Sequence, residues 1–293
     1  MGPQPHLHPD LPALTWGDRL PLNSMGEQAM RLLNKTAIII GAGQSPGTGI
    51  GNGRATALRF AQEGAAILAV DNRLDSAEET AALVRDAGGD CLAAEADVRR
   101  EASLAACVAT AMARWGRIDI LHYNVGVSLG GGDSIIDTIT EDAFDMISAI
   151  NLRGCIMVCK HVLPIMRAQK SGSIITISSV AAYENYPYVV YKATKAALVE
   201  FTKQVAIQNA ADGVRANTIL PGLMDTPMAV DTRARASNRP RAEIAAERAA
   251  RVPLRGEQGS GWDVANAALF LASDEARFIT GVALPVDGGA LVR

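Results

Sequence analysis

From Lys35 onward, short apolar runs alternate with longer amphipathic stretches along the chain. The apolar runs carry no regular polar alternation, which is typical of strands that are buried on both faces of a sheet. They are too short for buried helices and are bounded by glycine or polar residues. The pattern predicts seven strands, at residues 37–40, 66–70, 91–94, 118–123, 174–178, 215–220 and 282–286.

The stretches between the strands are rich in alanine and repeat their apolar positions at helical spacing. They predict helices at residues 54–62, 76–86, 101–115, 142–169, 191–210 and 263–272. Because strands alternate with helices, the fold class is α/β: a doubly wound, Rossmann-like parallel sheet of about seven strands with helices on both faces. Pro164 removes one helical hydrogen bond, so we expect a kink in the long helix at 142–169.

Residues 1–33 differ from the rest of the chain, because five of the 13 prolines precede Leu22 and no apolar period is sustained. We interpret them as a flexible N-terminal extension. No composition shift follows, so residues 34–293 are expected to form a single domain.

The charge is nearly balanced, with 28 basic and 31 acidic residues. No global field therefore favours nucleic acid or an anionic membrane as a partner. The apolar runs are shorter than the roughly 18 residues that a membrane span requires. The N-terminus lacks the pattern of a secretory signal, which makes the cytoplasm the expected location.

Four cysteines in a chain of 293 residues do not suggest a disulfide framework. Cys155 and Cys159 are four residues apart, but no second Cys or His pair lies at ligand spacing. We therefore expect small buried thiols and no metal site.

A glycine-rich segment from Gly41 to Gly53 joins the first strand to the first helix. Glycines allow the backbone to turn tightly beside a pyrophosphate at a helix N-terminus. Asp71 ends the second strand, where a carboxylate can accept hydrogen bonds from both ribose hydroxyls of an adenosine. Asp97 and Val98 follow the third strand, where they can meet the adenine edge. NADP carries a phosphate in place of one ribose hydroxyl, so Asp71 predicts NAD, although Arg54 and Arg73 are counter-evidence.

Further motifs complete a resemblance to the short-chain dehydrogenase/reductase family, in its compact single-domain form. The similarity covers nearly all of the chain from Lys35 onward. It is carried by the segments Gly41…Gly53, Asp97-Val98, Tyr123-Asn124-Val125-Gly126, Asn151, Ser178-Ser179, Tyr191-Lys-Ala-Thr-Lys195, Asn217, Pro221-Gly222 and Pro285-Val-Asp-Gly-Gly289.

The resemblance implies an oxidoreductase that transfers a hydride between NAD(H) and a secondary alcohol or ketone. It also implies a homotetramer and a small-molecule substrate. The expected cofactor-binding residues are Gly41, Gly51, Asn52, Gly53, Asp71, Asp97, Val98, Asn124, Gly126, Tyr191, Lys195, Pro221, Gly222, Leu223 and Thr226.

The expected catalytic residues are Asn151, Ser179, Tyr191 and Lys195. A tyrosine has a pKa near 10, too high for a base at neutral pH unless positive charge favours the phenolate. Lys195 lies four residues after Tyr191 on the same helix face and can supply that charge. Ser179 would hydrogen-bond the substrate oxygen, and Asn151 matches the family asparagine that completes a proton relay through water.

Two assignments require a choice between neighbours. Tyr188 also has a lysine four residues on, but Tyr191 begins the stretch that continues the family helix. The interval from Ser178 to Tyr191 has the usual family length, whereas strand register favours Ser179 with a loop one residue shorter. We predict Tyr191 and Ser179.

Three features depart from the family pattern. About six extra residues lie within the glycine loop, so the glycines between Gly43 and Gly49 have no assigned counterparts. Tyr123 stands where the family usually has an asparagine. Residues 223–256, which would close over the substrate, hold seven arginines: Arg233, Arg235, Arg239, Arg241, Arg248, Arg251 and Arg255. A solvated lid helix and an anionic substrate both remain open.

The sequence thus predicts an NAD-dependent dehydrogenase/reductase with Tyr191 as general acid and base. The competing hypothesis is a nucleotide-binding sensor or scaffold that kept the fold without turnover. A sugar-nucleotide epimerase or dehydratase would need a larger C-terminal substrate domain than the residues after Gly289 provide.

Overall fold

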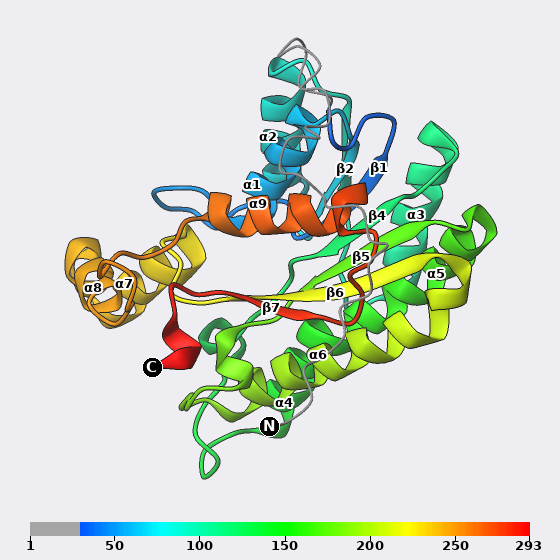
Figure 1. The fold of residues 1–293 in the computed structure, drawn as a ribbon. Helices are drawn as coiled ribbons and strands as arrows, with labels where there is room; N and C mark the ends of the chain where they lie inside the picture. Colours follow the sequence, from blue (N-terminus) through cyan, green and yellow to red (C-terminus); the bar gives the residue numbers. More distant parts are fainter. Residues whose placement is uncertain (1–29) are drawn as a thin grey trace, which may run out of the picture.

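A seven-stranded parallel sheet runs through the computed structural model, which describes residues 30–293 (Figure 1). The strand order is β3-β2-β1-β4-β5-β6-β7, so the chain builds outward from β1 in one direction and then from β4 in the other. The predicted doubly wound, single-domain fold is confirmed. The strands are β1 Thr36–Ile40, β2 Ala66–Asp71, β3 Cys91–Glu95, β4 Ile120–Tyr123, β5 Gly172–Ile177, β6 Val214–Pro221 and β7 Ala283–Val286.

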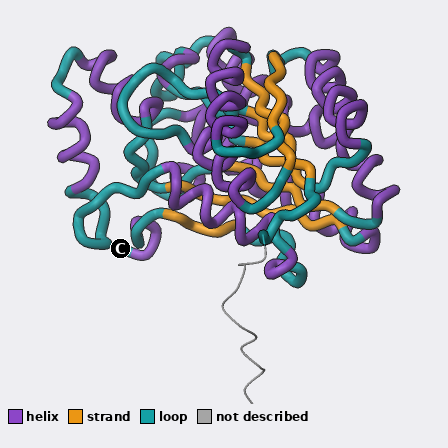
Figure 2. The backbone as a smooth tube through the Cα atoms, turned by 90° about the horizontal axis from the view of Figure 1, so that it is seen from above, coloured by secondary structure: helices purple, strands orange, loops and turns teal. Residues whose placement is uncertain are grey.

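Helices cover both faces of this sheet, as the view from above shows (Figure 2). On one face α1, α2 and α9 pack over a core that contains Phe60, Val84 and Leu269. On the other face α3, α5 and α6 enclose a second core. The two cores explain why the central strands carry apolar residues on both of their faces. The helices are α1 Asn52–Gln62, α2 Leu74–Asp86, α3 Glu101–Trp115, α4 Glu141–Ser148, α5 Gly154–Gln169, α6 Val189–Asn209, α7 Thr232–Ser237, α8 Arg241–Ala249 and α9 Gly261–Ala272.

The long helix predicted at 142–169 is interrupted, but not at the proline. A π turn at Ala149–Arg153 separates α4 from α5, and α5 continues through Pro164 to Gln169. By length and composition, Glu141–Gln169 is apolar enough to cross a membrane. In this fold its apolar side packs into the core, because Val158, Val162 and other α5 residues lie buried against the sheet.

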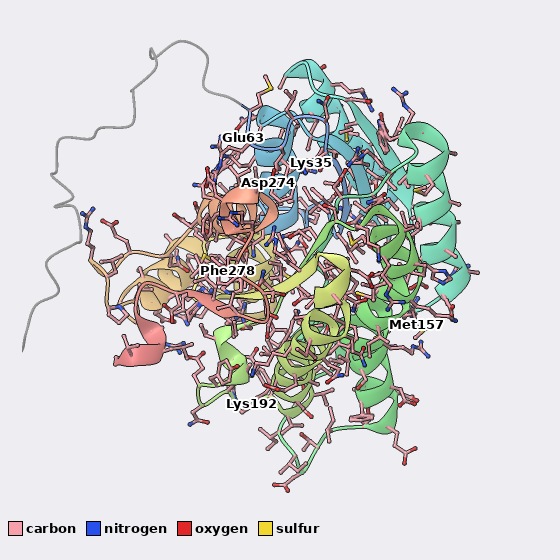
Figure 3. All side chains as sticks on the ribbon, turned by 45° about the vertical axis from the view of Figure 1, so that its right-hand side comes forward. Lys35, Glu63, Met157, Lys192, Asp274 and Phe278 are labelled. Atoms are coloured by element: carbon pink, nitrogen blue, oxygen red, sulfur yellow. The ribbon has the colours of Figure 1, made fainter. Side chains whose placement is uncertain are left out.

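The first described residues are part of the packed structure. Leu32 is fully buried, and its amide donates a hydrogen bond to the Glu63 carbonyl (2.9 Å). Lys35 forms an ion pair with Asp274 (3.7 Å), and these residues lie near Glu63 at one end of the molecule (Figure 3). The expected flexible extension at 1–33 otherwise lies outside the described residues.

The sheet order determines where a ligand can bind. The strand order reverses between β1 and β4, so the loops that leave their carboxyl ends diverge to opposite faces of the sheet. Such a switch point leaves a crevice in open α/β sheets. The glycine-rich segment follows β1, and Asn124 follows β4, so both predicted motifs meet there.

His122 in β4 is a polar side chain within the apolar core. It is fully buried, it packs edge-on against Phe60, and among residues 30–293 neither ring nitrogen has a hydrogen-bond partner. Burial lowers the pKa of His122 to about 3, since the charged imidazolium cannot be solvated there.

We expect His122→Leu to stabilise the protein by about 1–3 kcal/mol at pH 7.5, because an unsatisfied buried polar group is removed. The stability difference between variant and wild type should grow as the pH falls below about 6.5. In that range His122 is protonated in the unfolded wild-type protein but stays neutral in the folded protein, which lowers wild-type stability. Urea unfolding of both proteins at pH 7.5 and 5.0 measures this difference. A gap that stays constant between the two pH values would contradict the burial of a neutral imidazole.

Candidate active site

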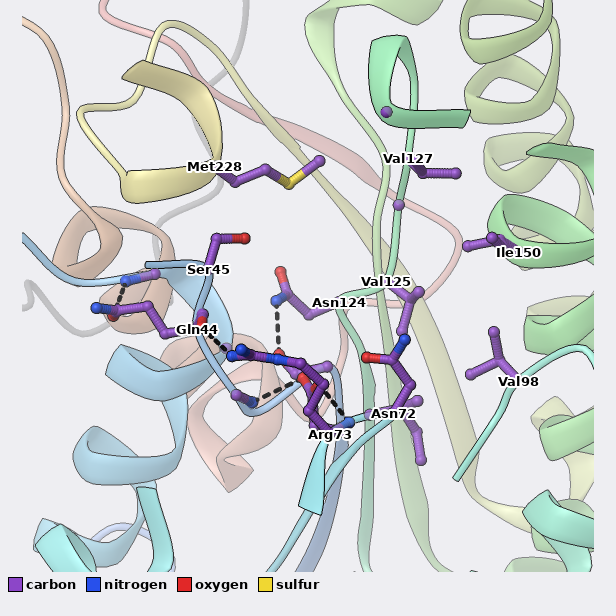
Figure 4. Close-up of a pocket in the computed structure, with 18 of the residues that line it drawn as sticks. Gln44, Ser45, Asn72, Arg73, Val98, Asn124, Val125, Val127, Ile150 and Met228 are labelled. Carbon is purple, nitrogen blue, oxygen red and sulfur yellow. Dashed lines mark hydrogen bonds between the residues drawn. The ribbon is translucent and has the colours of Figure 1, made fainter. Parts of the chain in front are cut away.

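A cavity of about 660 Å³ lies at the carboxyl ends of β1 to β4. Figure 4 shows Gln44 and Arg73 on one side of it and Val98 and Ile150 on the other. Ten of the predicted cofactor residues line this cavity: Gly41, Gly51, Asn52, Gly53, Asp71, Asp97, Val98, Asn124, Gly126 and Thr226. The other five line a smaller neighbouring cavity: Tyr191, Lys195, Pro221, Gly222 and Leu223.

Two glycines shape the turn from β1 into α1. Gly41 has a φ of +82°, a conformation that favours glycine. A Cβ on Gly53 would lie 1.9 Å from the Gly41 carbonyl oxygen, so only glycine allows α1 to begin this close to the strand. Asn124 joins the same carbonyl from β4 by donating a hydrogen bond through Nδ2 (3.0 Å; Figure 4). The N-terminus of α1 is thereby held against the cavity.

Asp71 lies at the end of the cavity formed by β2. Its Oδ2 accepts a hydrogen bond from the Gly43 amide (3.0 Å), and its Oδ1 accepts one from the Arg73 amide (3.2 Å). The Arg73 guanidinium lies along the cavity and donates to the Gln44 carbonyl (2.7 Å). Arg54 is directed elsewhere, toward Thr80 and Glu79 on α2.

Asp97 and Val98 line the cavity after β3. The Asp97 carboxylate accepts hydrogen bonds from Nε and Nη2 of Arg99 (3.0 and 2.8 Å). This pair holds the pKa of Asp97 below its usual range. The Asp97 carboxylate is therefore ionised, and Arg99 already donates hydrogen bonds to both of its oxygens.

Asn52 lies on the wall that the two cavities share. Its Oδ1 is buried and accepts no hydrogen bond from any residue that the structure describes. A buried acceptor of this kind normally has a partner, so its position fits a polar ligand group or a water molecule.

The smaller cavity, about 170 Å³, lies between the end of β5, the start of α6 and the 223–256 segment. Ser179, Tyr191 and Lys195 all line it. Ser178 is buried, and its hydroxyl donates to the Lys195 carbonyl (2.7 Å). The Ser179 hydroxyl instead accepts a hydrogen bond from the Ala181 amide (3.1 Å) and lies close enough to the Tyr191 phenol to lower its pKa, so the two serines have different surroundings.

Tyr191 is half-buried in the wall of the small cavity, and desolvation of its phenol raises its pKa to about 12. The Ser179 hydroxyl and the positive charge of Arg233 act in the opposite direction. Lys195 Nζ lies 5.7 Å from the ring centre of Tyr191. Burial therefore outweighs the neighbouring positive charges, and the phenol keeps its proton at neutral pH.

Lys195 is almost fully buried, and its Nζ donates to the carbonyls of Val125 (3.1 Å) and Ile177 (2.8 Å). Burial lowers the pKa of this ammonium to about 8. Gly126 makes room for it, because a Cβ there would lie 3.0 Å from Nζ. The competing lysine, Lys192, donates to backbone carbonyls that include Glu184 (2.6 Å) and does not line the cavity.

Asn151 lies in the π turn, a deformation that is frequent at functional sites. Its Oδ1 accepts from the Val127 amide (2.8 Å), and its Nδ2 donates to the Val127 carbonyl and to Thr194 Oγ1. Tyr123 holds the same turn by donating to the Ile150 carbonyl (2.6 Å). The asparagine side chain thus connects the loop after β4 to α6.

Two residues of this site are not among those expected from the sequence. Asp133 is buried and accepts hydrogen bonds from the amides of Val190 (3.1 Å) and Tyr191 (2.9 Å), so it caps α6 beside the phenol. Tyr186 lines the small cavity, and its ring centre is 5.4 Å from that of Tyr191. Asp133 lies 58 residues from Tyr191, and no local pattern marks it as a cap.

A family model described as enoyl-(acyl carrier protein) reductase matches residues 47–290. A 2-(R)-hydroxypropyl-CoM dehydrogenase of Xanthobacter autotrophicus is 35% identical over 87% of this chain and 98% of its own. The chain belongs to the short-chain dehydrogenase/reductase family. A 2,5-dichloro-2,5-cyclohexadiene-1,4-diol dehydrogenase of Sphingobium indicum is 36% identical over 89% of this chain and 98% of its own. A solved short-chain dehydrogenase/reductase from Burkholderia xenovorans is 43% identical, covers 90% of this chain and 99% of its own, and has a TM-score of 0.82.

This short-chain dehydrogenase/reductase uses its enlarged glycine loop to contact the lid, residues 223–256. The Thr48 amide donates to Asp231 Oδ1 (3.2 Å), and Arg235 donates to the Pro46 carbonyl (3.0 Å). Arg241 joins the two segments by donating to Asp231 Oδ2 (3.2 Å) and to the Thr48 carbonyl (3.4 Å). Residues 47–49 of this loop do not line the larger cavity, and Gly47 and Thr48 lie against Asp231 of the lid.

We expect Gly47→Ala to separate loop and lid, because the added Cβ would lie 2.5 Å from Asp231 Cγ. Lid amides at 226–249 should exchange faster with solvent, and a nicotinamide dinucleotide should bind roughly three- to tenfold more weakly, since Thr226 and Met228 of the lid line the larger cavity. Hydrogen–deuterium exchange and NADH titration measure the two effects. Gly116→Ala is the control: its φ is also positive (+70°), but nothing lies within 4 Å of the added Cβ. Unchanged lid exchange in Gly47→Ala would show that the loop does not hold the lid.

Proposed function

We propose that this protein is an NAD-dependent dehydrogenase/reductase that interconverts a secondary alcohol and a ketone, with Tyr191 as general acid and base. One observation carries the proposal: Ser179, Tyr191 and Lys195 line a small cavity that shares Asn52, Asn124 and Thr226 with the larger cavity at the switch point. A hydroxyl donor, a titratable phenol and a buried ammonium thus lie next to a nucleotide-sized cleft.

The larger cavity fits a dinucleotide by its chemistry. Asp71 at one end offers carboxylate oxygens to a ribose, and the N-terminus of α1 faces the cavity with Asn52, whose Oδ1 is a buried acceptor on the wall shared with the small cavity. Asp97, Val98 and Gly126 would complete the walls, with Pro221, Gly222, Leu223 and Thr226 on the lid side. When bound, the nicotinamide supplies the hydride acceptor for oxidation or the hydride donor for reduction.

Each catalytic side chain has a distinct task in this proposal. In oxidation Tyr191 takes the hydroxyl proton of the alcohol, and in reduction it donates a proton to the ketone oxygen. Ser179 donates a hydrogen bond to the same oxygen, where negative charge develops. Lys195 adds positive charge that favours the phenolate. Asn151 holds the Val127 loop through both atoms of its amide, and the family water relay is a further expectation for it.

The relatives support an alcohol or ketone substrate, because their names describe dehydrogenases of a hydroxypropyl compound and of a cyclic diol. A nucleotide-binding sensor or scaffold is the competing proposal. A protein that only binds nucleotide needs no phenol beside a serine hydroxyl, so the Tyr191 site favours the enzyme. A homotetramer in the cytoplasm, acting on a small molecule, remains our expectation for its assembly and location.

Screening the purified protein with NAD against small cyclic and aliphatic secondary alcohols, and with NADH against the matching ketones, tests the proposal. Absorbance at the NADH band should change with at least one pair, in opposite directions for the two reactions. Tight NADH binding without turnover of any pair would favour the sensor.

Tyr191→Phe should reduce turnover by about 10²- to 10⁴-fold while NADH affinity stays within a few-fold, because only the proton carrier is lost. Since burial raises the pKa of Tyr191, wild-type alcohol oxidation should accelerate from pH 7 to pH 10, and residual oxidation by the variant should not. Tyr188→Phe is the matched control, since Tyr188 does not line the cavity. Loss of activity in Tyr188→Phe alone would overturn the assignment.

NAD(H) should exceed NADP(H) in kcat/KM by about tenfold or more. Two unit charges about 4 Å apart repel by about 4 kcal/mol at an effective dielectric of 20, and even half of that exceeds a factor of ten. Asp71→Ala should lower the ratio of kcat/KM for NAD(H) to that for NADP(H). Arg73→Ala should raise this ratio, because Arg73 lies at the same end of the cavity and would favour a phosphate. Equal use of both cofactors by the wild type would refute the role of Asp71.

A further inference from the structure

The fold separates the seven arginines of the lid into different environments. Arg239 pairs with Glu243 and Glu247 on α8, and Arg241 pairs with Asp225 and Asp231. Arg235 donates to the Pro46 carbonyl, whereas Arg251 and Arg255 are exposed. Arg233 and Arg248 are the two that line the small cavity beside Tyr191.

Neither of these two arginines has a carboxylate within ion-pair distance among residues 30–293. Arg233 donates one hydrogen bond, from Nη1 to the Ala229 carbonyl (2.8 Å). Arg248 donates from Nε to Gln258 Oε1 (2.9 Å) and from Nη2 to the Met224 carbonyl (3.2 Å). A guanidinium has five N–H donors, so each keeps donors beyond those bonds.

The cavity lining carries an excess of positive charge. Its cationic side chains are Lys195, Arg233 and Arg248, and its one acidic side chain is Glu184. Burial, together with repulsion from Arg233 and Arg251, lowers the pKa of Arg248 to about 10. Two arginines that repel each other across a small cavity gain stability from an anion placed between them.

We infer that the substrate carries an oxyanion, a carboxylate or sulfonate, which Arg233 and Arg248 hold while its carbinol or carbonyl carbon lies at Tyr191. This inference rests on the proposed function. Arg233 and Arg248 do not line the larger cavity, so the phosphates of the cofactor are not their expected ligand. The 170 Å³ of the cavity is below the roughly 300–1,000 Å³ of drug-sized sites, which suits a substrate of few atoms.

The test compares anions with neutral compounds of the same shape. The probes are 3-hydroxybutanoate with 3-hydroxybutanamide, and 2-hydroxypropane-1-sulfonate with the corresponding sulfonamide. Calorimetry measures their binding to the protein–NADH complex, and NADH formation measures their oxidation. At least one anion should bind about tenfold or more tightly than its neutral partner, as charge-assisted hydrogen bonds predict.

Arg233→Gln should reduce the ratio of anion affinity to neutral-compound affinity by about tenfold or more. Arg233→Lys should restore part of this ratio, because lysine carries the positive charge but lacks the two parallel N–H donors of arginine. The ratio is the measured quantity because Arg233 also lowers the pKa of Tyr191, which slows both kinds of substrate equally when the charge is lost. Arg251→Gln is the matched control, an exposed lid arginine outside the cavity. Thermal unfolding and NADH affinity show that each variant is folded.

The outcomes separate this inference from the proposed function. If the amides bind and react as well as the anions, the enzyme assignment stands and the anion site is refuted. If the anions bind through Arg233 but no probe is oxidised, the anion site stands and the oxidation of such alcohols fails. Equal losses in Arg233→Gln and Arg251→Gln, weaker NADH binding with an unchanged ratio, or no anion binding at millimolar concentration would each overturn the inference.

Discussion

The buried ammonium of Lys195 is the interaction on which the site depends. An ammonium out of water must keep its donors satisfied, and Nζ does so through the carbonyls of Val125, just after β4, and Ile177, the last residue of β5. The Lys195 carbonyl in turn accepts from Ser178. These bonds fix α6 against the carboxyl edge of the sheet, so Tyr191, one turn earlier, is held in the wall of the small cavity.

A second group of buried polar contacts orients the same helix from its other side. Asp133 caps α6 at Tyr191, and Asn151 connects the Val127 loop to Thr194 within α6. Each of these side chains is buried and hydrogen-bonded, which makes displacement costly. The phenol is therefore positioned by a network, while the apolar cores on the two sheet faces supply rigidity.

The lid completes the site from a distant part of the chain. Asp231 and Arg241 of the lid bond to Thr48 of the glycine loop, so the segment that follows β1 and the segment that follows β6 are joined directly. The same lid places Arg233 and Arg248 on the small cavity and leaves other arginines paired or exposed.

The sequence by itself determined the order and type of the elements, because apolar runs of strand length and amphipathic stretches of helical period each depend on neighbours in the chain. It also located the glycine loop, Asp71 and the Tyr191/Lys195 pair, whose spacing is local. Only the tertiary structure decided that Asp133 caps α6, that a π turn at Ala149–Arg153 interrupts the long helix, and which arginines of the lid face the cavity. Those features arise from hydrogen bonds and ion pairs between residues far apart in sequence, and no periodicity along one chain encodes which distant partner a charged side chain will meet.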